Sequence, residues 1–332
     1  MKKIFKVAGI AILLLLVLVA AAATYISTAL PDVGPAETLT VERTPERIER
    51  GRYLASSVSV CIDCHSTRDW SKFSGPIVPG TIGKGGERFD QSVGLPGAFF
   101  SKNITPEGLN RYSDGELLRV ITTGVNKEGK AMFPLMPYPY YGKMDREDLF
   151  SIIAYLRTLE PIQNDIPSSK PDFPINILIN TMPQKADYQT RPDSKDQLAY
   201  GAYMTNIAGC VECHTRFEKG KIIPEFSFGG SRDFILPDGS IVRSANISPD
   251  DNTGIGKWTK EQFVARFTMY ADSSFTLPEV KPGEFNTIMP WSMYGKMKEE
   301  DLEAIFAYLK TVKPINNKVA LFTAADKVKS SK

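Results

Sequence analysis

The chain has 332 residues, of which 42% are hydrophobic and 23% are charged, and its formal net charge is +2. This length accommodates two domains of ordinary size, and the hydrophobic content is sufficient for packed cores. A net charge so close to zero excludes the strongly basic composition typical of nucleic-acid-binding proteins.

The N-terminus combines three lysines with a long apolar run. We expect residues 1–6 to be cytoplasmic and residues 7–26 to cross the inner membrane, because about 20 apolar residues span the hydrocarbon core. The run is longer than the apolar core of a typical signal peptide, although the small residues Ala20–Ala23 leave cleavage open. The preceding lysines predict that the remaining chain faces the periplasm.

Residues 27–45 read as a linker that leads into a helix. Thr44 is a candidate N-cap, Pro45 suits the first helical position and Glu46 the first turn. The pentapeptide Cys61-Ile62-Asp63-Cys64-His65 follows, and Cys210-Val211-Glu212-Cys213-His214 repeats it. Both read C-x-x-C-H, the pattern of covalent haem c attachment. We therefore expect Cys61, Cys64, Cys210 and Cys213 to hold two haems c, with His65 and His214 as proximal iron ligands.

A residue census favours this interpretation over three others. All four cysteines and both histidines of the chain lie in the two pentapeptides. Disulfides within such short loops would be strained and would leave the histidines unexplained. A four-cysteine zinc site does not require a histidine after each pair. A thioredoxin-like redox pair expects a βαβ pattern, which is absent here.

Further matches show that the repetition extends beyond the cysteines. Asn103-Ile104-Thr105-Pro106 recurs as Asn246-Ile247-Ser248-Pro249, and Met136-Pro137-Tyr138 recurs as Met289-Pro290-Trp291. Tyr141-Gly142-Lys143-Met144 likewise recurs as Tyr294-Gly295-Lys296-Met297. We interpret the chain as a tandem duplication of one domain, in residues 46–161 and 198–316, with residues 162–197 joining the copies and 317–332 forming a C-terminal tail.

Each copy has the same predicted helices. A middle helix begins after Ser113, and its counterpart begins at Thr259, where Gln262 completes a capping box. The last helices carry apolar stripes at helical spacing and are expected to stop at Pro161 and Pro314. Because no segment alternates with a period of two, the predicted fold class is all-α, with long loops around each haem.

The joining segment contains an apolar stretch, residues 173–182. We expect this stretch to pack between the domains. The alternative is an exposed patch for a partner subunit or the membrane surface.

The distal iron ligands must come from residues other than histidine, because no third histidine exists. The remaining candidates for the distal position are methionine, lysine, tyrosine, the N-terminal amine and an open site. The repeat favours Met136 and Met289, which match each other and precede a proline. Methionine ligation raises the potential of a haem. The methionines set aside are Met144 and Met297, which suit a hydrophobic staple before a helix, and Met132 and Met293, which lack counterparts.

With these motifs, the chain resembles the class I cytochrome c superfamily. Within it, the Asn-Ile-Thr-Pro element, Thr253–Trp258 and Met-Pro-Tyr are similar to the cytochrome c subunits of bacterial membrane-bound alcohol, aldehyde and gluconate dehydrogenases. The resemblance covers residues 46–315 and implies that the first and last helices of each domain cross. Gly51, Tyr53 and Tyr155 match that crossing, as do Gly201, Tyr203 and Tyr308. Those subunits often carry three haem domains, whereas this chain has two haem motifs.

Four residues are candidate contacts of the haem propionates. Tyr112 and Trp258 occupy matching positions before their middle helices, and Arg88 and Arg243 have a suitable charge. For the aromatic pair, simple core packing is the alternative, and for the arginines it is a solvated surface.

The expected function is electron transfer by a membrane-tethered dihaem cytochrome c, which is not itself an enzyme. It would link a membrane-bound dehydrogenase or quinol-oxidising complex to a terminal oxidase or a soluble cytochrome. One alternative is a dihaem enzyme, either peroxidase-like or thiosulfate dehydrogenase-like. The lack of a spare histidine and the presence of both Met-Pro elements argue against a peroxidase. A cytochrome subunit of an oxidase complex is the other alternative.

Overall fold

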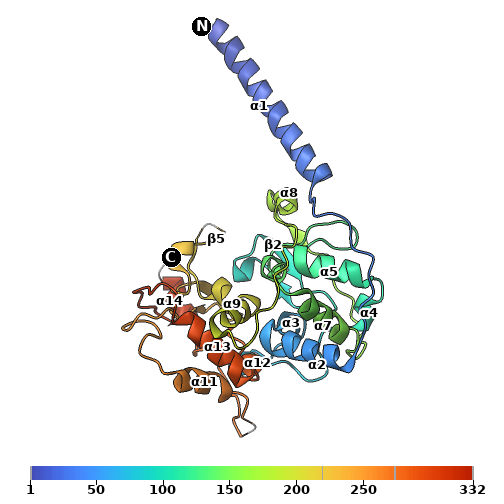
Figure 1. The fold of residues 1–332 in the computed structure, drawn as a ribbon. Coiled ribbons are helices and arrows are strands. Elements are labelled where there is room, and N and C mark those ends of the chain that lie inside the picture. Colours follow the sequence, from blue (N-terminus) through green and yellow to red (C-terminus); the bar gives the residue numbers. More distant parts are fainter. Residues whose placement is uncertain (1, 219, 273, 331–332) are drawn as a thin grey trace.

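The structure, a computed structural model, describes residues 2–218, 220–272 and 274–330. Met1, in the predicted cytoplasmic N-terminus, and the last two residues of the 317–332 tail lie outside the described residues. Helix α1 (Lys2–Ala29) projects from a body formed by the following residues (Figure 1). Among the described residues, α1 alone has the length and composition to cross a membrane. A signal sequence near the N-terminus has the same length and composition.

The first half of the body forms the helices that the sequence predicts. Thr44 caps α2 by accepting a hydrogen bond from the backbone nitrogen of Arg47, and Ser113 forms a capping box with Glu116. The helical elements are α2 (Pro45–Tyr53), the π-helix η1 (Leu54–Val58), α3 (Cys61–Cys64), the 3-10 helix η2 (Gln91–Val93), α4 (Pro106–Leu109), α5 (Asp114–Thr123), α6 (Tyr138–Tyr141) and α7 (Arg146–Leu156).

The second half has counterparts of α2, α3, α5, α6 and α7 in the same order, namely α9, α10, α11, α12 and α13. The predicted capping box of Thr259 and Gln262 opens α11. The elements are α9 (Gln197–Ile207), α10 (Cys210–Cys213), the 3-10 helix η4 (Pro224–Phe226), α11 (Lys260–Thr268), α12 (Trp291–Tyr294), α13 (Glu299–Leu309) and, in the tail, α14 (Ala325–Ser330).

The expected stops of the last helices at Pro161 and Pro314 are wrong by several residues. Helix α7 ends at Leu156 and α13 at Leu309, well before either proline. In both halves the chain leaves the helix through a turn, in which the nitrogens of Thr158 and Thr311 donate to carbonyls three residues earlier.

Short strands correct the expectation of an all-α fold. They form small antiparallel sheets with the orders β1-β2-β3, β4-β5 and β6-β7-β8. Strands of two to four residues are too short to show a recognisable alternation in sequence. Their bounds are β1 (Arg88–Phe89), β2 (Gly97–Phe100), β3 (Lys170–Pro171), β4 (Phe217–Glu218), β5 (Lys221–Ile222), β6 (Asp233–Ile235), β7 (Ile241–Arg243) and β8 (Phe322–Thr323).

The first and last helices of each half cross at a glycine, as expected. A Cβ atom on Gly51 would lie 1.8 Å from the carbonyl oxygen of Ser151, and one on Gly201 would lie 1.9 Å from that of Ala304. Only glycine permits backbones to approach so closely. Tyr53 and Tyr203 were expected to take part in these crossings. The structure differs, because both hydroxyls reach into the opposite half of the body.

These two tyrosines form a reciprocal pair of contacts between the halves. The Tyr203 hydroxyl donates a 2.7 Å hydrogen bond to Asp148 at the start of α7. The Tyr53 hydroxyl donates in the same way to Asp301 at the start of α13. Both carboxylates are buried, and one hydrophobic core cluster includes residues of both halves. The two halves therefore pack as a single body.

The joining segment emerges from the sheet of the first half. Strand β3 is followed by α8 (Ile175–Leu178) and the 3-10 helix η3 (Ile179–Thr181). Phe173 is 80% exposed and Leu178 40%, whereas Ile179 is buried. The expectation that this stretch packs between the domains is therefore wrong for Phe173 and Leu178, which face away from the body. Figure 1 shows α8 beside the end of α1, with which it is in contact.

Candidate haem centres

Each C-x-x-C-H motif forms a single helical turn. The residue before the turn, Val60 or Gly209, has a left-handed backbone. All four cysteines are free, so neither pair forms a disulfide. Within residues 2–218, 220–272 and 274–330, no group of three or more histidine, cysteine or acidic side chains is arranged to hold a metal ion. The structure thus gives no support to the disulfide and zinc interpretations.

Both histidines are oriented by a backbone carbonyl. The Nδ1 atom of His65 lies 2.6 Å from the carbonyl oxygen of Lys102, and Nδ1 of His214 lies 2.8 Å from that of Ala245. Since a carbonyl oxygen only accepts, each Nδ1 must carry the proton, which leaves Nε2 as a free electron-pair donor. Burial lowers the pKa of both imidazoles and favours their neutral form. A neutral, oriented imidazole is the state that binds iron.

The repeated Asn-Ile-Thr/Ser-Pro element explains where these carbonyls come from. In each half, the residue before the asparagine supplies the oxygen. Asn103 donates from its amide to the carbonyl of Ile162, and Asn246 to that of Ile315, both at 2.7 Å. The element therefore ties the carbonyl that orients the histidine to the chain after the last helix.

A glycine in the left-handed region completes this arrangement. The nitrogens of Gly85 and Gly230 donate to the carbonyls of His65 and His214, at 2.9 and 2.7 Å. Both glycines have a positive φ, and a Cβ atom on either would collide with the backbone of the segment that holds the histidine. A side chain at either position is therefore disfavoured by the backbone conformation and by the lack of space.

The acidic residue inside each motif is paired with an arginine. Asp63 lies 3.0 Å from Arg68, and Glu212 pairs with Arg232. Burial raises the pKa of Asp63 to about 6, although Arg68 acts in the opposite direction. Glu212 also accepts a 2.8 Å hydrogen bond from the Tyr140 hydroxyl of the first half.

The two motifs lie near each other across the interface of the halves. Desolvation raises the pKa of the Cys64 thiol to about 12, with smaller contributions from Asp63 and Cys213. In turn, Asp63 acts on the pKa of Cys213. These electrostatic effects require short separations. The arrangement brings the two cysteine pairs to one region of the body.

Met136 and Met289 lie in the loops that lead into α6 and α12. Both are partly buried, and Met136 packs against the main hydrophobic core. Met144 and Met297, by contrast, are buried members of that core. This agrees with the expectation that the second pair serves in packing.

A tyrosine in each half connects the methionine loop to the haem motif, a role that no sequence pattern identified. The Tyr141 hydroxyl donates a 3.0 Å hydrogen bond to the carbonyl of Ser59, and the Tyr294 hydroxyl a 2.6 Å bond to that of Ala208. Each acceptor lies two residues before the first cysteine. The recurrence of Tyr141 as Tyr294 was the available signal.

Ser74 is a second residue that sequence reasoning missed. It is fully buried in the first half, and its hydroxyl donates a 2.6 Å hydrogen bond to the carbonyl oxygen of Met289. The same hydroxyl accepts a 3.0 Å bond from the nitrogen of Trp291. One half of the body therefore holds the methionine loop of the other. None of the repeated motifs includes Ser74, so the repeat did not single it out.

The four candidate propionate contacts lie in separate environments. Arg88 is 2.7 Å from Asp90, and Arg243 is 2.8 Å from Asp233, so both arginines already face carboxylates. Tyr112 is partly buried against the core, whereas Trp258 is 37% exposed.

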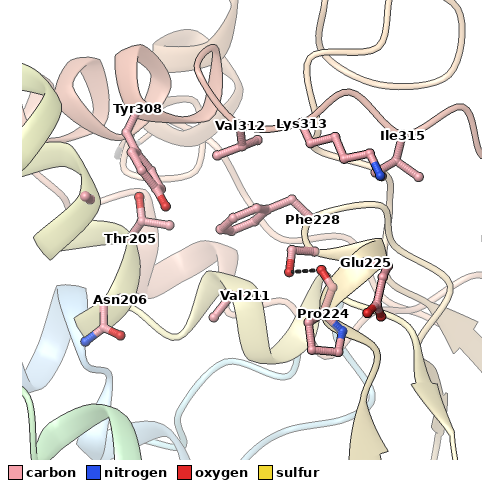
Figure 2. Close-up of a pocket in the computed structure, with 12 residues that line it drawn as sticks. Thr205, Asn206, Val211, Pro224, Glu225, Phe228, Tyr308, Val312, Lys313 and Ile315 are labelled. Atoms are coloured by element: carbon pink, nitrogen blue, oxygen red, sulfur yellow. Dashed lines mark hydrogen bonds between the residues drawn. The ribbon is translucent and has the colours of Figure 1, made fainter.

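A cavity of about 340 Å³ lies beside the second motif (Figure 2). Tyr308 and Phe228 point into it, and Val211 of the motif forms part of its wall. Neither His214 nor Met289 is among its lining residues. It is therefore a cavity beside the crossing of α9 and α13 and is not lined by either predicted iron ligand of this half.

Comparisons with known proteins agree with this geometry. Residues 198–313 match the family described as cytochrome c. The cytochrome c subunit of alcohol dehydrogenase (quinone) from Gluconacetobacter polyoxogenes is 25% identical over 287 residues, covering 81% of this chain and 56% of that relative. The gluconate 2-dehydrogenase cytochrome c subunit of Pantoea cypripedii is 26% identical over 301 residues, covering 85% and 63%.

A third relative is nearer in length to this chain. The diheme cytochrome c-type protein of Cereibacter sphaeroides is 24% identical over 267 residues, which cover 77% of this chain and 82% of the relative. By contrast, the chain spans less than two thirds of the length of the two dehydrogenase subunits. Residues 198–313 therefore match the cytochrome c family, and most of the chain is similar to the cytochrome c subunits of alcohol dehydrogenase (quinone) and gluconate 2-dehydrogenase.

Proposed function

We propose that this protein is a membrane-tethered dihaem cytochrome c that transfers single electrons. Cys61 and Cys64 would hold one haem c, and Cys210 and Cys213 the second. The proposed axial pairs are His65 with Met136 and His214 with Met289. In this proposal the body is a tandem duplication of one cytochrome c domain.

The orientation of the histidines carries the proposal. In each half an imidazole follows a cysteine pair, donates from Nδ1 to a backbone carbonyl and leaves Nε2 free. These donors suit covalently bound haem, and no other histidine or cysteine of the chain competes with them. Bound haem supplies a one-electron Fe(III)/Fe(II) couple. The chain would hold the two imidazoles in the ligating tautomer, and Met136 and Met289 would each supply a thioether to an iron.

The placement of the two motifs supports electron transfer between them. Tyr140 of the first half donates a 2.8 Å hydrogen bond to Glu212 inside the second motif, and Cys213 acts electrostatically on Cys64. Two centres in a single packed body would form a short route for electrons. The propionate contacts at Tyr112, Trp258, Arg88 and Arg243 stay predictions, and both arginines already pair with carboxylates.

The relatives suggest a dehydrogenase as the electron donor. Two of them are named as cytochrome c subunits of alcohol and gluconate dehydrogenases. We infer that α1 anchors this chain in the inner membrane, with its body in the periplasm, where a dehydrogenase subunit delivers electrons. A terminal oxidase or a soluble cytochrome would accept them.

Carbon monoxide binding tests this function against that of a dihaem enzyme. Two methionine-ligated irons leave no open position, so the reduced protein should bind carbon monoxide slowly and incompletely in stopped-flow absorbance. Rapid, stoichiometric binding to either haem of the unmodified protein would show an open iron and reject the electron-carrier proposal. Purification of the native complex from membranes, followed by identification of its subunits, tests the dehydrogenase partner.

A further inference from the structure

The strongest feature outside the haem centres is the apolar segment 173–182, which we call the interfacial segment. We propose that it inserts into the outer surface of the lipid bilayer and forms a second attachment of the body beside α1. This inference rests on the proposed role of α1 as a membrane anchor.

The composition of the segment suits the boundary between lipid headgroups and acyl chains. No charged residue occurs between Asp172 and Lys185. Phe173 is 80% exposed and Leu178 40% exposed. Apolar side chains clustered on a surface mark an interaction site, and apolar residues beside a membrane anchor partition into the interfacial layer.

The position of the segment identifies lipid as the occupant. Helices α8 and η3 contact α1, and Figure 1 shows them at the end of α1 nearest the body. A helix of 28 residues is about 42 Å long, which exceeds the roughly 30 Å hydrocarbon core. The last turns of α1 therefore reach the membrane–water boundary. Tyr25, which is 61% exposed, lies in these turns, where aromatic residues anchor spanning helices.

The segment is firmly connected to the first haem-motif half. Lys170 and Pro171 of β3 pair with Ala98 and Gly97 of β2, and the nitrogen of Asp172 donates to the carbonyl of Pro96 at 3.0 Å. Ile179 is buried and fixes the other end. With both α1 and this segment at the bilayer, the first half would be held against the membrane in one orientation, whereas a single flexible tether would permit many.

Site-directed spin labelling of the full chain tests the inference. The four native cysteines would be bound to haem, so an added cysteine is the only free thiol, and the parent protein should take up no label. We would place one nitroxide by Phe173→Cys, a reference on α1 by Tyr25→Cys, and an aqueous control by Met269→Cys. Met269 is 41% exposed and lies next to α11, at the end of the body far from α1 (Figure 1).

The variants would be reconstituted, without other proteins, into phosphatidylcholine vesicles. Power-saturation measurements would compare relaxation by oxygen, which concentrates in lipid, with relaxation by a water-soluble nickel chelate. We expect the label at residue 173 to resemble that at residue 25 and to be more accessible to oxygen, whereas the label at residue 269 favours the chelate.

Each other outcome overturns the inference in a distinguishable way. A chelate-accessible label at residue 173, with residue 25 in lipid, leaves the anchor intact and removes the second attachment. A label at residue 173 that is shielded from both reagents indicates a protein contact. Chelate access at residues 173 and 25 together would reject the membrane anchor as well.

Discussion

The hydroxyl of Ser74 donates a 2.6 Å hydrogen bond to the carbonyl oxygen of Met289, although the two residues belong to different halves of the body. The backbone nitrogen of Ser74 also donates to Asn286, at 2.9 Å. The first half therefore holds the loop that presents Met289. Among the described residues, no serine hydroxyl donates to the carbonyl of Met136 in the same way.

Ser74→Ala should loosen this loop and affect the second haem alone. The change removes a buried hydroxyl with two hydrogen bonds, a loss of about 1–3 kcal/mol. We expect a weaker methionine–iron charge-transfer band, a lower potential for one haem and faster carbon monoxide binding at that haem. Redox titration followed by absorbance measures the potentials of both.

Ser71→Ala is the matched control, because Ser71 lies in the same loop but is itself exposed, and its hydroxyl donates to the nearby Asp69. Both haem potentials of the Ser71→Ala variant should equal those of the parent protein. Identical behaviour of the Ser71 and Ser74 variants would contradict a specific role for Ser74.

Replacement of the proposed distal ligands should separate the two irons. Met136→Ala and Met289→Ala should each lower the potential of one haem by more than ~0.1 V, part of the roughly 0.8 V range that axial ligands cover. The other haem should keep its potential. Met144→Ala removes a core methionine instead and should reduce stability without a selective loss of one potential. If neither potential moves in Met136→Ala, that residue is not a ligand.

The tyrosines that tie each methionine loop to its haem motif make a matched pair of tests. Tyr294→Phe leaves the carbonyl of Ala208 without its 2.6 Å hydrogen bond, and Tyr141→Phe removes the equivalent 3.0 Å bond to Ser59. We expect each variant to lose about 1–3 kcal/mol of folding free energy and to weaken one methionine–iron band. Loss of the same band in both variants would argue that the tyrosines do not act within their own halves.

Asp148 should be important for the assembly of the two halves. Its buried carboxylate accepts hydrogen bonds from Arg50, Arg191 and, across the interface, Tyr203. Asp148→Ala leaves these donors without their partner, so we expect a loss of about 3 kcal/mol in the free energy of unfolding. Denaturant titration monitored by circular dichroism would measure it.

An exposed ion pair offers the comparison for Asp148. Glu49 bonds Arg52 on the surface of α2, where solvent screens the pair. Glu49→Gln should leave the unfolding midpoint unchanged. Equal midpoints for the Asp148 and Glu49 variants would mean that the carboxylate network does not hold the halves together.

Local patterns predicted much of this molecule. The capping residues Thr44, Ser113 and Thr259 fix helix starts through contacts within four residues, so the sequence is sufficient to locate them. The paired haem motifs were visible because the repeat displays them twice, and the glycine crossings followed from the resemblance to class I cytochromes c. The apolar run of α1 was equally plain from composition.

Long-range contacts explain what the sequence did not reveal. Strands β3 and β8 pair with strands more than 70 residues earlier in the chain, and strands of two to four residues carry no periodic signal. The exchange of Tyr53 and Tyr203 between halves depends on how two domains dock, which no local pattern encodes. The same applies to Ser74, whose partners lie more than 200 residues away in the chain.

The mass of the intact, denatured protein tests the central claim most directly, because only covalently attached haem survives denaturation. After expression with the cytochrome c maturation system, the account predicts the mass of the chain plus two haems, falling to one haem when Cys61 and Cys64 are both replaced by alanine. A parent mass with one haem, or with none, would contradict the assignment of two haem c centres.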